Sequence, residues 1–176
     1  MPDNVTRRGL ITSTLITGSF LVLGERLTLT PAEATELGFT SDVLSREQLN
    51  AIETVAEHIV PGSHRAGIAA YIDSQLNAGE NSLLIGKYLG VDTSGQIAFY
   101  ENLADNLVAA LKTEQSVQEI VGALWGDALG TWEGPPSSYM LFVLRADALD
   151  VTYGTPEGFE ALGIPYMAHI MPETPW

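Results

Sequence analysis

Hydrophobic residues recur at intervals of three and four along most of this chain, which is the spacing of one face of an α-helix. The clearest case begins at Ser45, where Gln48 completes a capping box three positions later, and it stops at Pro61-Gly62. Its apolar positions are Leu49, Ile52, Val55, Ala56 and Ile59. The pattern therefore predicts an amphipathic helix between Ser45 and Pro61.

Further helices are predicted from the same periodicity over residues 66–76, 82–89 and 96–112. Another begins with the capping box of Ser116 and Glu119 and is expected to end in a left-handed cap at Gly130. Residues 138–151 are also predicted to be helical and largely buried, because this apolar run exceeds the usual strand length of roughly 3 to 10 residues. The expected fold class is all-α, a single bundle of five or six helices.

The helical pattern ends after Tyr153-Gly154. Residues 155–176 contain six proline and glycine residues that disfavour a continuing helix, yet they are too apolar for a solvated tail. We therefore expect an extended segment that lies against either the helices of this chain or another subunit. Aromatic and methionine side chains are enriched at protein interfaces. The candidate partner-interface residues in this segment are Phe159, Tyr166, Met167, His169 and Trp176.

The start of the chain has the pattern of a twin-arginine export signal. Arg7 and Arg8 precede residues 9–24, which contain no charged side chain, and Ala32-Glu33-Ala34 has the small-x-small form of a cleavage site. We predict a signal segment over residues 1–34 and one helical domain over residues 35–176, exported already folded through the twin-arginine translocon. The protein is then expected at the extracytoplasmic face of the membrane or the cell surface, either cleaved after Ala34 or anchored by its signal. A buried N-terminal helix preceded by a chance arginine pair is the alternative.

Charge narrows the choice of partners. The 176 residues include 22 acidic and 8 basic side chains, which gives a net charge of -14. Such a surface repels phosphate backbones, so nucleic acid is disfavoured as a partner. Only two lysines occur, and an acidic, lysine-poor surface suggests a halophilic source. The alternative is an ordinary acidic protein, because charged residues make up only 17% of the chain.

Few residues offer chemistry. The chain has no cysteine, which excludes thiolate zinc sites, iron–sulfur ligation and c-type haem attachment. It also has neither a dinucleotide fingerprint nor a phosphate-binding loop, so we expect no cofactor and no catalytic residue in this chain. His58 and His64 flank the turn at Pro61-Gly62, and a metal site would need a third ligand from afar, such as Asp73 or His169. Imidazoles near a helix C-terminus more often complement its dipole.

Charges in the apolar run 138–151 are expected to be structural. Arg145 is predicted to pair with Asp73 or Glu119 inside the bundle. Ser63 and His64 are neighbours in sequence, but no nucleophile elbow surrounds them, so nucleophilic catalysis is discounted.

Three stretches together resemble the gluconate 2-dehydrogenase subunit 3 family. They are the twin-arginine opening, the turn Ile59-Val60-Pro61-Gly62 leading to Ala66-Gly67-Ile68 and Tyr71-Ile72-Asp73, and the run from Tyr153-Gly154-Thr155 through Gly158-Phe159 and Leu162-Gly163-Ile164-Pro165-Tyr166 to His169. The resemblance implies a helical, non-catalytic small subunit that accompanies a large flavoprotein dehydrogenase of the glucose-methanol-choline type.

In such a complex the FAD and the oxidation of a sugar, sugar acid or alcohol belong to the large subunit, and electrons pass to a membrane haem subunit or a quinone. The small subunit would serve folded export and assembly. The alternative function is a stand-alone exported protein that binds a metal or small ligand near His58, His64 and His169.

Overall fold

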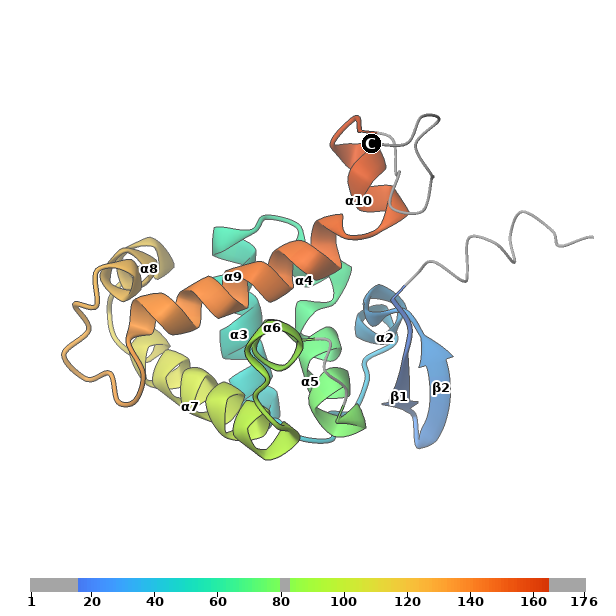
Figure 1. Ribbon diagram of the computed structural model, residues 1–176, viewed down its shortest axis with the longest axis horizontal. Helices are drawn as coiled ribbons and strands as arrows, with labels where there is room; N and C mark the ends of the chain where they lie inside the picture. The colour runs from blue at the N-terminus through green and yellow to red at the C-terminus, as the bar shows by residue number, and fades with distance from the viewer. Residues whose placement is uncertain (1–15, 80–82, 165–176) are drawn as a thin grey trace, which may run out of the picture.

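The computed structural model describes residues 16–79 and 83–164, and this part of the chain is mostly helical with one small β-hairpin (Figure 1). The elements in chain order are β1 (Gly18–Val22), β2 (Glu25–Leu29), α2 (Pro31–Glu36), α3 (Arg46–Ile59), α4 (Ser63–Ala66), α5 (Ile68–Ala78), α6 (Leu84–Leu89), α7 (Thr93–Leu111), α8 (Val117–Trp125), α9 (Ser137–Tyr153) and α10 (Pro156–Ala161). The five longest helices are α3, α5, α7, α8 and α9, so the expected helical class is confirmed.

Local signals set most of the helix starts. The capping boxes at Ser45 and Ser116 are both formed, and α3 and α8 begin directly after them. The helix expected over residues 66–76 is divided at Gly67, whose φ of 83° is left-handed and ends α4 before α5 begins. α8 stops at Gly126 rather than at the expected Gly130, because the following residue, Asp127, takes φ 50° and directs the chain toward α9.

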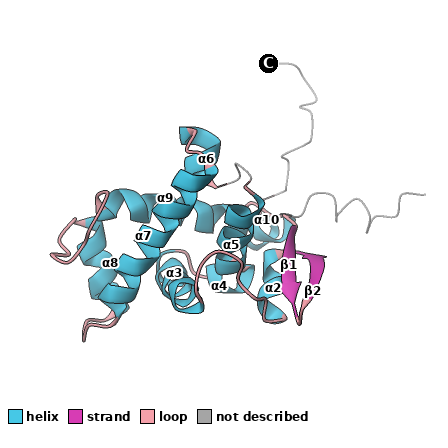
Figure 2. Ribbon diagram, turned by 90° about the horizontal axis from the view of Figure 1, so that it is seen from below, coloured by secondary structure: helices cyan, strands magenta, loops and turns pink. Residues whose placement is uncertain are grey.

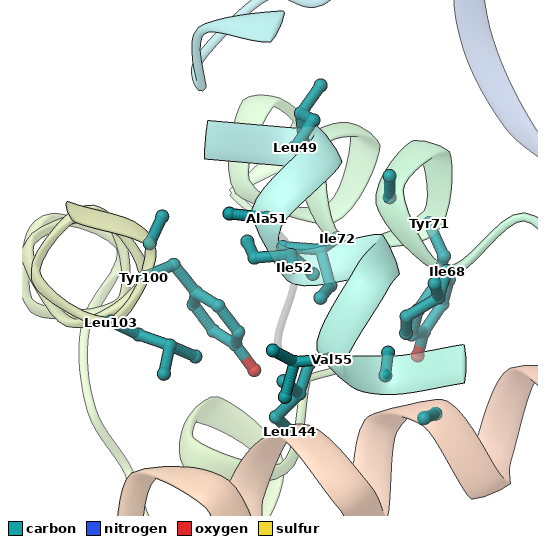
Figure 3. Packing of buried hydrophobic residues seen from close by; sticks show 14 of the residues in the cluster. Leu49, Ala51, Ile52, Val55, Ile68, Tyr71, Ile72, Tyr100, Leu103 and Leu144 are labelled. Atoms are coloured by element: carbon teal, nitrogen blue, oxygen red, sulfur yellow. The ribbon is translucent and has the colours of Figure 1, made fainter. Parts of the chain in front are cut away.

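The core lies where α3, α5, α7 and α9 meet. Figure 3 shows Ile52 and Val55 of α3, Tyr100 and Leu103 of α7 and Leu144 of α9 pointing toward one another. All five of these side chains are fully buried. Nine of the eleven residues of α5 are buried as well, so α5 is a central helix rather than a surface one. The amphipathic pattern thus located the core, but it did not show that α5 is covered on every side.

The hairpin β1–β2 was not expected from the sequence. Its strands are antiparallel, with Gly18 opposite Leu29 and Val22 opposite Glu25. Leu23 and Gly24 join them with φ values of 51° and 86°, which is the type I′ turn that suits a two-residue hairpin. The hairpin lies beside α2 and α5, at the end of the molecule opposite α8 (Figures 1 and 2). Residues 18–24 of the uncharged stretch 9–24 are therefore a strand and its turn, and not the helix that the alternative of a buried N-terminal helix predicts.

The segment after α9 departs from the expected extended form over its first part. Thr155 caps a short helix, α10, and Pro156 occupies its first turn, where a proline is well tolerated. Gly163, with φ 68°, follows the end of this helix. The expected extended form is therefore wrong for residues 156–161, and residues 165–176 lie outside the described part of the chain.

Candidate functional site

The histidines do not form a metal centre within the described residues. His58 lies in the last turn of α3 and His64 in the last turn of α4, and both are exposed. Nδ1 of His64 is 3.4 Å from Oε1 of Glu53, and the backbone N–H of His64 donates to the Glu57 carboxylate at 2.9 Å. Over residues 16–79 and 83–164, no group of three or more His, Cys, Asp or Glu side chains is arranged to hold a metal ion. His169 lies outside these ranges.

Buried carboxylates bind backbone N–H groups instead of cations. Asp73, in α5, is 2% exposed and accepts hydrogen bonds from the N–H groups of residues 42–44 at 2.7 to 3.0 Å. Glu119 is engaged with Ser116 in the capping box of α8. Arg145, by contrast, is exposed on α9. The prediction that Arg145 pairs with Asp73 or Glu119 is therefore wrong, because both carboxylates serve as caps for the backbone.

A second buried carboxylate joins three helices. Asp147 of α9 accepts a hydrogen bond from the hydroxyl of Tyr100 in α7 and another, at 2.9 Å, from the N–H of Leu84 at the start of α6. Burial raises the pKa of Asp147 to about 6, although both hydrogen bonds lower it. Burial and the nearby Asp147 carboxylate also raise the pKa of Tyr100 well above its usual value. The pair holds α6 in place; its groups face the core and not an open cleft.

A groove of about 490 Å³ lies between α2, α4, α9 and α10. Small and apolar residues line most of it, and its charged side chains are Glu33, Glu36 and Arg65. The buried hydroxyl of Thr152 in this lining has no hydrogen-bond partner. The volume of the groove falls within the range of ligand pockets. Its few polar groups restrict the groove to ligands with a mainly apolar body.

The outer face of α9 carries an apolar stripe. Tyr139, Phe142 and Leu149 lie at helical spacing along it and are 38%, 52% and 38% exposed. The opposite face is buried, with Met140, Val143 and Leu144 in the core. Phe99 of α7 packs edge-to-face against Tyr139 with ring centroids 6.0 Å apart, which fixes one end of the stripe. The sequence marked residues 138–151 as buried, and this exposed side was missed.

The predicted partner-interface residues are placed only in part. Phe159 lies half-buried in α10, whereas Tyr166, Met167, His169 and Trp176 fall outside the described residues. Arg7 and Arg8 of the predicted export signal also lie outside the described residues. Ala34, the predicted cleavage position, is fully buried within α2.

Comparisons with known proteins returned no matching family model, no matching curated protein and no matching solved structure. Among the described residues, no helix has both the length and the apolar character needed to span a membrane.

Proposed function

We propose that this chain is the non-catalytic small subunit of an exported flavin-dependent dehydrogenase, which acts in folded export and assembly of the large flavoprotein subunit. The observation that carries the proposal is the apolar stripe Tyr139–Phe142–Leu149 on the outer face of α9. Large apolar side chains that gather on one face of a helix are normally covered by another element or by a partner chain. Within the described structure, this face of α9 has no such cover, so a partner chain is expected to supply it.

The shape and composition of the stripe suit a protein partner. Large aromatic and aliphatic side chains bury much area for little loss of conformational entropy, and such residues form the centre of interfaces. Arg145 and Asp150 flank the stripe as exposed charges, as a polar rim would. The twin-arginine pattern and the resemblance to the subunit 3 family support a flavoprotein dehydrogenase as this partner, with its FAD and substrate site in the large subunit.

Native co-purification tests the proposal. The full chain, tagged at its C-terminus in its native host, is expected to bring down a much larger protein with the absorption spectrum of an oxidised flavin. Phe142→Asp is expected to weaken this association at least tenfold, because it places a charge in the middle of the stripe. Ala109→Asp on the exposed side of α7 is the matched control and is expected to retain the partner.

Two results would refute the assignment. A partner-free monomer from the native host contradicts the small-subunit function. A flavoprotein retained equally by Phe142→Asp and Ala109→Asp contradicts the stripe as the docking surface.

The groove favours a second candidate function, the binding of a small ligand. An apolar hollow of about 490 Å³ with one unpartnered hydroxyl is able to bind a molecule with an apolar body and one hydrogen-bonding group. The fluorescent probe anilinonaphthalene sulfonate is expected to bind the folded protein, and Ala161→Trp, which fills the groove from α10, is expected to abolish that binding. Unchanged probe fluorescence in Ala161→Trp would remove this alternative.

A further inference from the structure

We propose that residues 16–34 remain part of the mature protein as a fixed layer over α5, so that a signal peptidase does not cut after Ala34. The structural argument uses only described residues. The encounter of the folded chain with a signal peptidase rests on the proposed function, because twin-arginine export would bring the chain to the peptidase already folded.

The hairpin supplies a buried face to the core. Phe20 and Val22 of β1 are 3% and 4% exposed, and the ring of Phe20 packs edge-to-face on Phe39 with centroids 6.2 Å apart. β1 runs so close to α5 that a Cβ at Gly18 would lie 3.4 Å from the hydroxyl of Ser74. Side chains from residues expected to be discarded therefore fill part of the interior.

The chain on either side of Ala34 is also hydrogen-bonded together. The N–H of Thr40 donates to the carbonyl of Leu21 at 2.7 Å, which adds a bridge to the free edge of β1. The Arg26 guanidinium pairs with Asp42 at 2.7 Å. The N–H of Asp42 in turn donates to the buried carboxylate of Asp73. Loss of residues 16–34 after cleavage would remove Leu21 and Arg26 from this network. The N–H of Thr40 and the carboxylate of Asp42 would then lose these partners.

The bond to be cut is itself inside a helix. α2 is closed at its start by a capping box between Thr30 and Glu33, and the carbonyl of Ala34 accepts a hydrogen bond from the N–H of Phe39 at 3.0 Å. The first turn of α2 packs against Gly67, where an added Cβ would come within 2.3 Å of the carbonyl of Pro31. A peptidase that must bind an extended strand would first have to unwind α2 and lift it from α5.

The site pattern Ala32-Glu33-Ala34 therefore has a structural explanation. Small residues are required where α2 approaches the helices beneath it, and Ala34 is fully buried there. The same residues that match a cleavage rule are those that close packing favours.

Three chains test the inference: the full chain, a chain that begins at Ile16 and a chain that begins at Thr35. The Ile16 chain is expected to melt within a few degrees of the full chain. The Thr35 chain is expected to melt about 10 °C lower or more, or to show no cooperative transition. A Thr35 chain that melts like the full chain overturns the proposal.

Two measurements on the intact protein complete the test, because they do not depend on whether the Thr35 chain folds. The amide of Phe39 is expected to exchange with solvent as slowly as the amides of α5, and fast exchange would show that α2 opens freely. The mass of the protein purified from its native host is expected to place the mature N-terminus at or before Ile16. An N-terminus at Thr35 refutes the inference, whereas absence of a flavoprotein in the same preparation refutes only the proposed function.

Discussion

α5 and α9 are both long helices rich in apolar side chains, but only α5 is covered on every side. β1, α2, α3, α7 and α9 pack around α5, and nine of its eleven residues are buried. α9 lies across the face of the molecule seen in Figure 1, and its Phe142 is 52% exposed. The difference shows that residues 16–34 of the same chain cover the exposed side that α5 would otherwise have. In the described structure, no segment covers the outer face of α9 in this way.

Two phenylalanines make the comparison measurable. Phe20 covers α5 and is 3% exposed, whereas Phe142 lies on the bare face of α9. Phe20→Ala is expected to lower the free energy of unfolding by about 3 to 5 kcal/mol, because it opens a cavity between β1 and the core. Phe142→Ala is expected to change it by less than about 1 kcal/mol. Urea unfolding of the isolated chain measures both, and similar values would contradict the proposed difference between the two faces.

The two helices also use their buried aspartates differently. Asp73 of α5 binds three consecutive N–H groups of the segment that leads into α3. Asp73→Ala leaves these donors without partners and is expected to cost about 3 kcal/mol. Asp73→Asn retains one acceptor oxygen, which serves Val43 and Leu44, and is expected to cost about half as much. Equal losses for the two variants in urea unfolding would show that the hydrogen bonds to residues 42–44 are not the cause.

Asp147 of α9 is expected to make stability depend on pH. Burial raises its pKa from 3.8 to about 6 in the folded protein, and Asp150 adds to this rise. The folded state therefore binds the proton more tightly than the unfolded state. The resulting stabilisation is complete below about pH 4 and is lost as the pH rises through 6, by up to about 3 kcal/mol.

Asp147→Asn removes this titration while it keeps the shape of the side chain. As the pH rises from 4 to 8, the free energy of unfolding of Asp147→Asn is expected to increase relative to that of the wild type. Glu101→Gln on the exposed side of α7 is the control and is expected to follow the wild type. Parallel curves for Asp147→Asn and the wild type would show that Asp147 does not titrate in this range.

Sequence periodicity was sufficient for the longer helices because their signals are local, whereas the short helices α2, α4 and α10 were not predicted. Ser45 with Gln48 and Ser116 with Glu119 fixed the starts of α3 and α8, and apolar spacing identified the buried faces. The hairpin was missed because its strands are short and β2 is almost entirely exposed, so no alternation of buried and exposed residues marks it. Arginines ahead of an uncharged stretch also favoured an export signal over a strand.

The candidate site was harder to predict, because it depends on contacts between distant segments. Asp147 was noted only as a charge in an apolar run, and its partner Tyr100 lies 47 residues away. When large apolar residues occur on two faces of a helix, sequence spacing gives no information on which of the two faces remains exposed. It therefore did not identify the stripe of α9, and it assigned the interface instead to the aromatic residues near the C-terminus.

The turn of the hairpin offers a small but selective test of the layer over α5. Leu23 has φ 51° and is 95% exposed, so it has a backbone conformation that leucine disfavours and no packing to offset the cost. Leu23→Asn is expected to raise the free energy of unfolding by about 1 kcal/mol, because asparagine suits this position of a type I′ turn. Leu23→Ala removes the same exposed apolar group, but alanine lacks the preference of asparagine for this turn position. The free energy of unfolding is therefore expected to rise less in Leu23→Ala than in Leu23→Asn. If the hairpin were detached from the cooperative fold, neither variant would change the urea midpoint of the α5 core. A rise of the urea midpoint in Leu23→Asn alone would show that the hairpin unfolds together with this core.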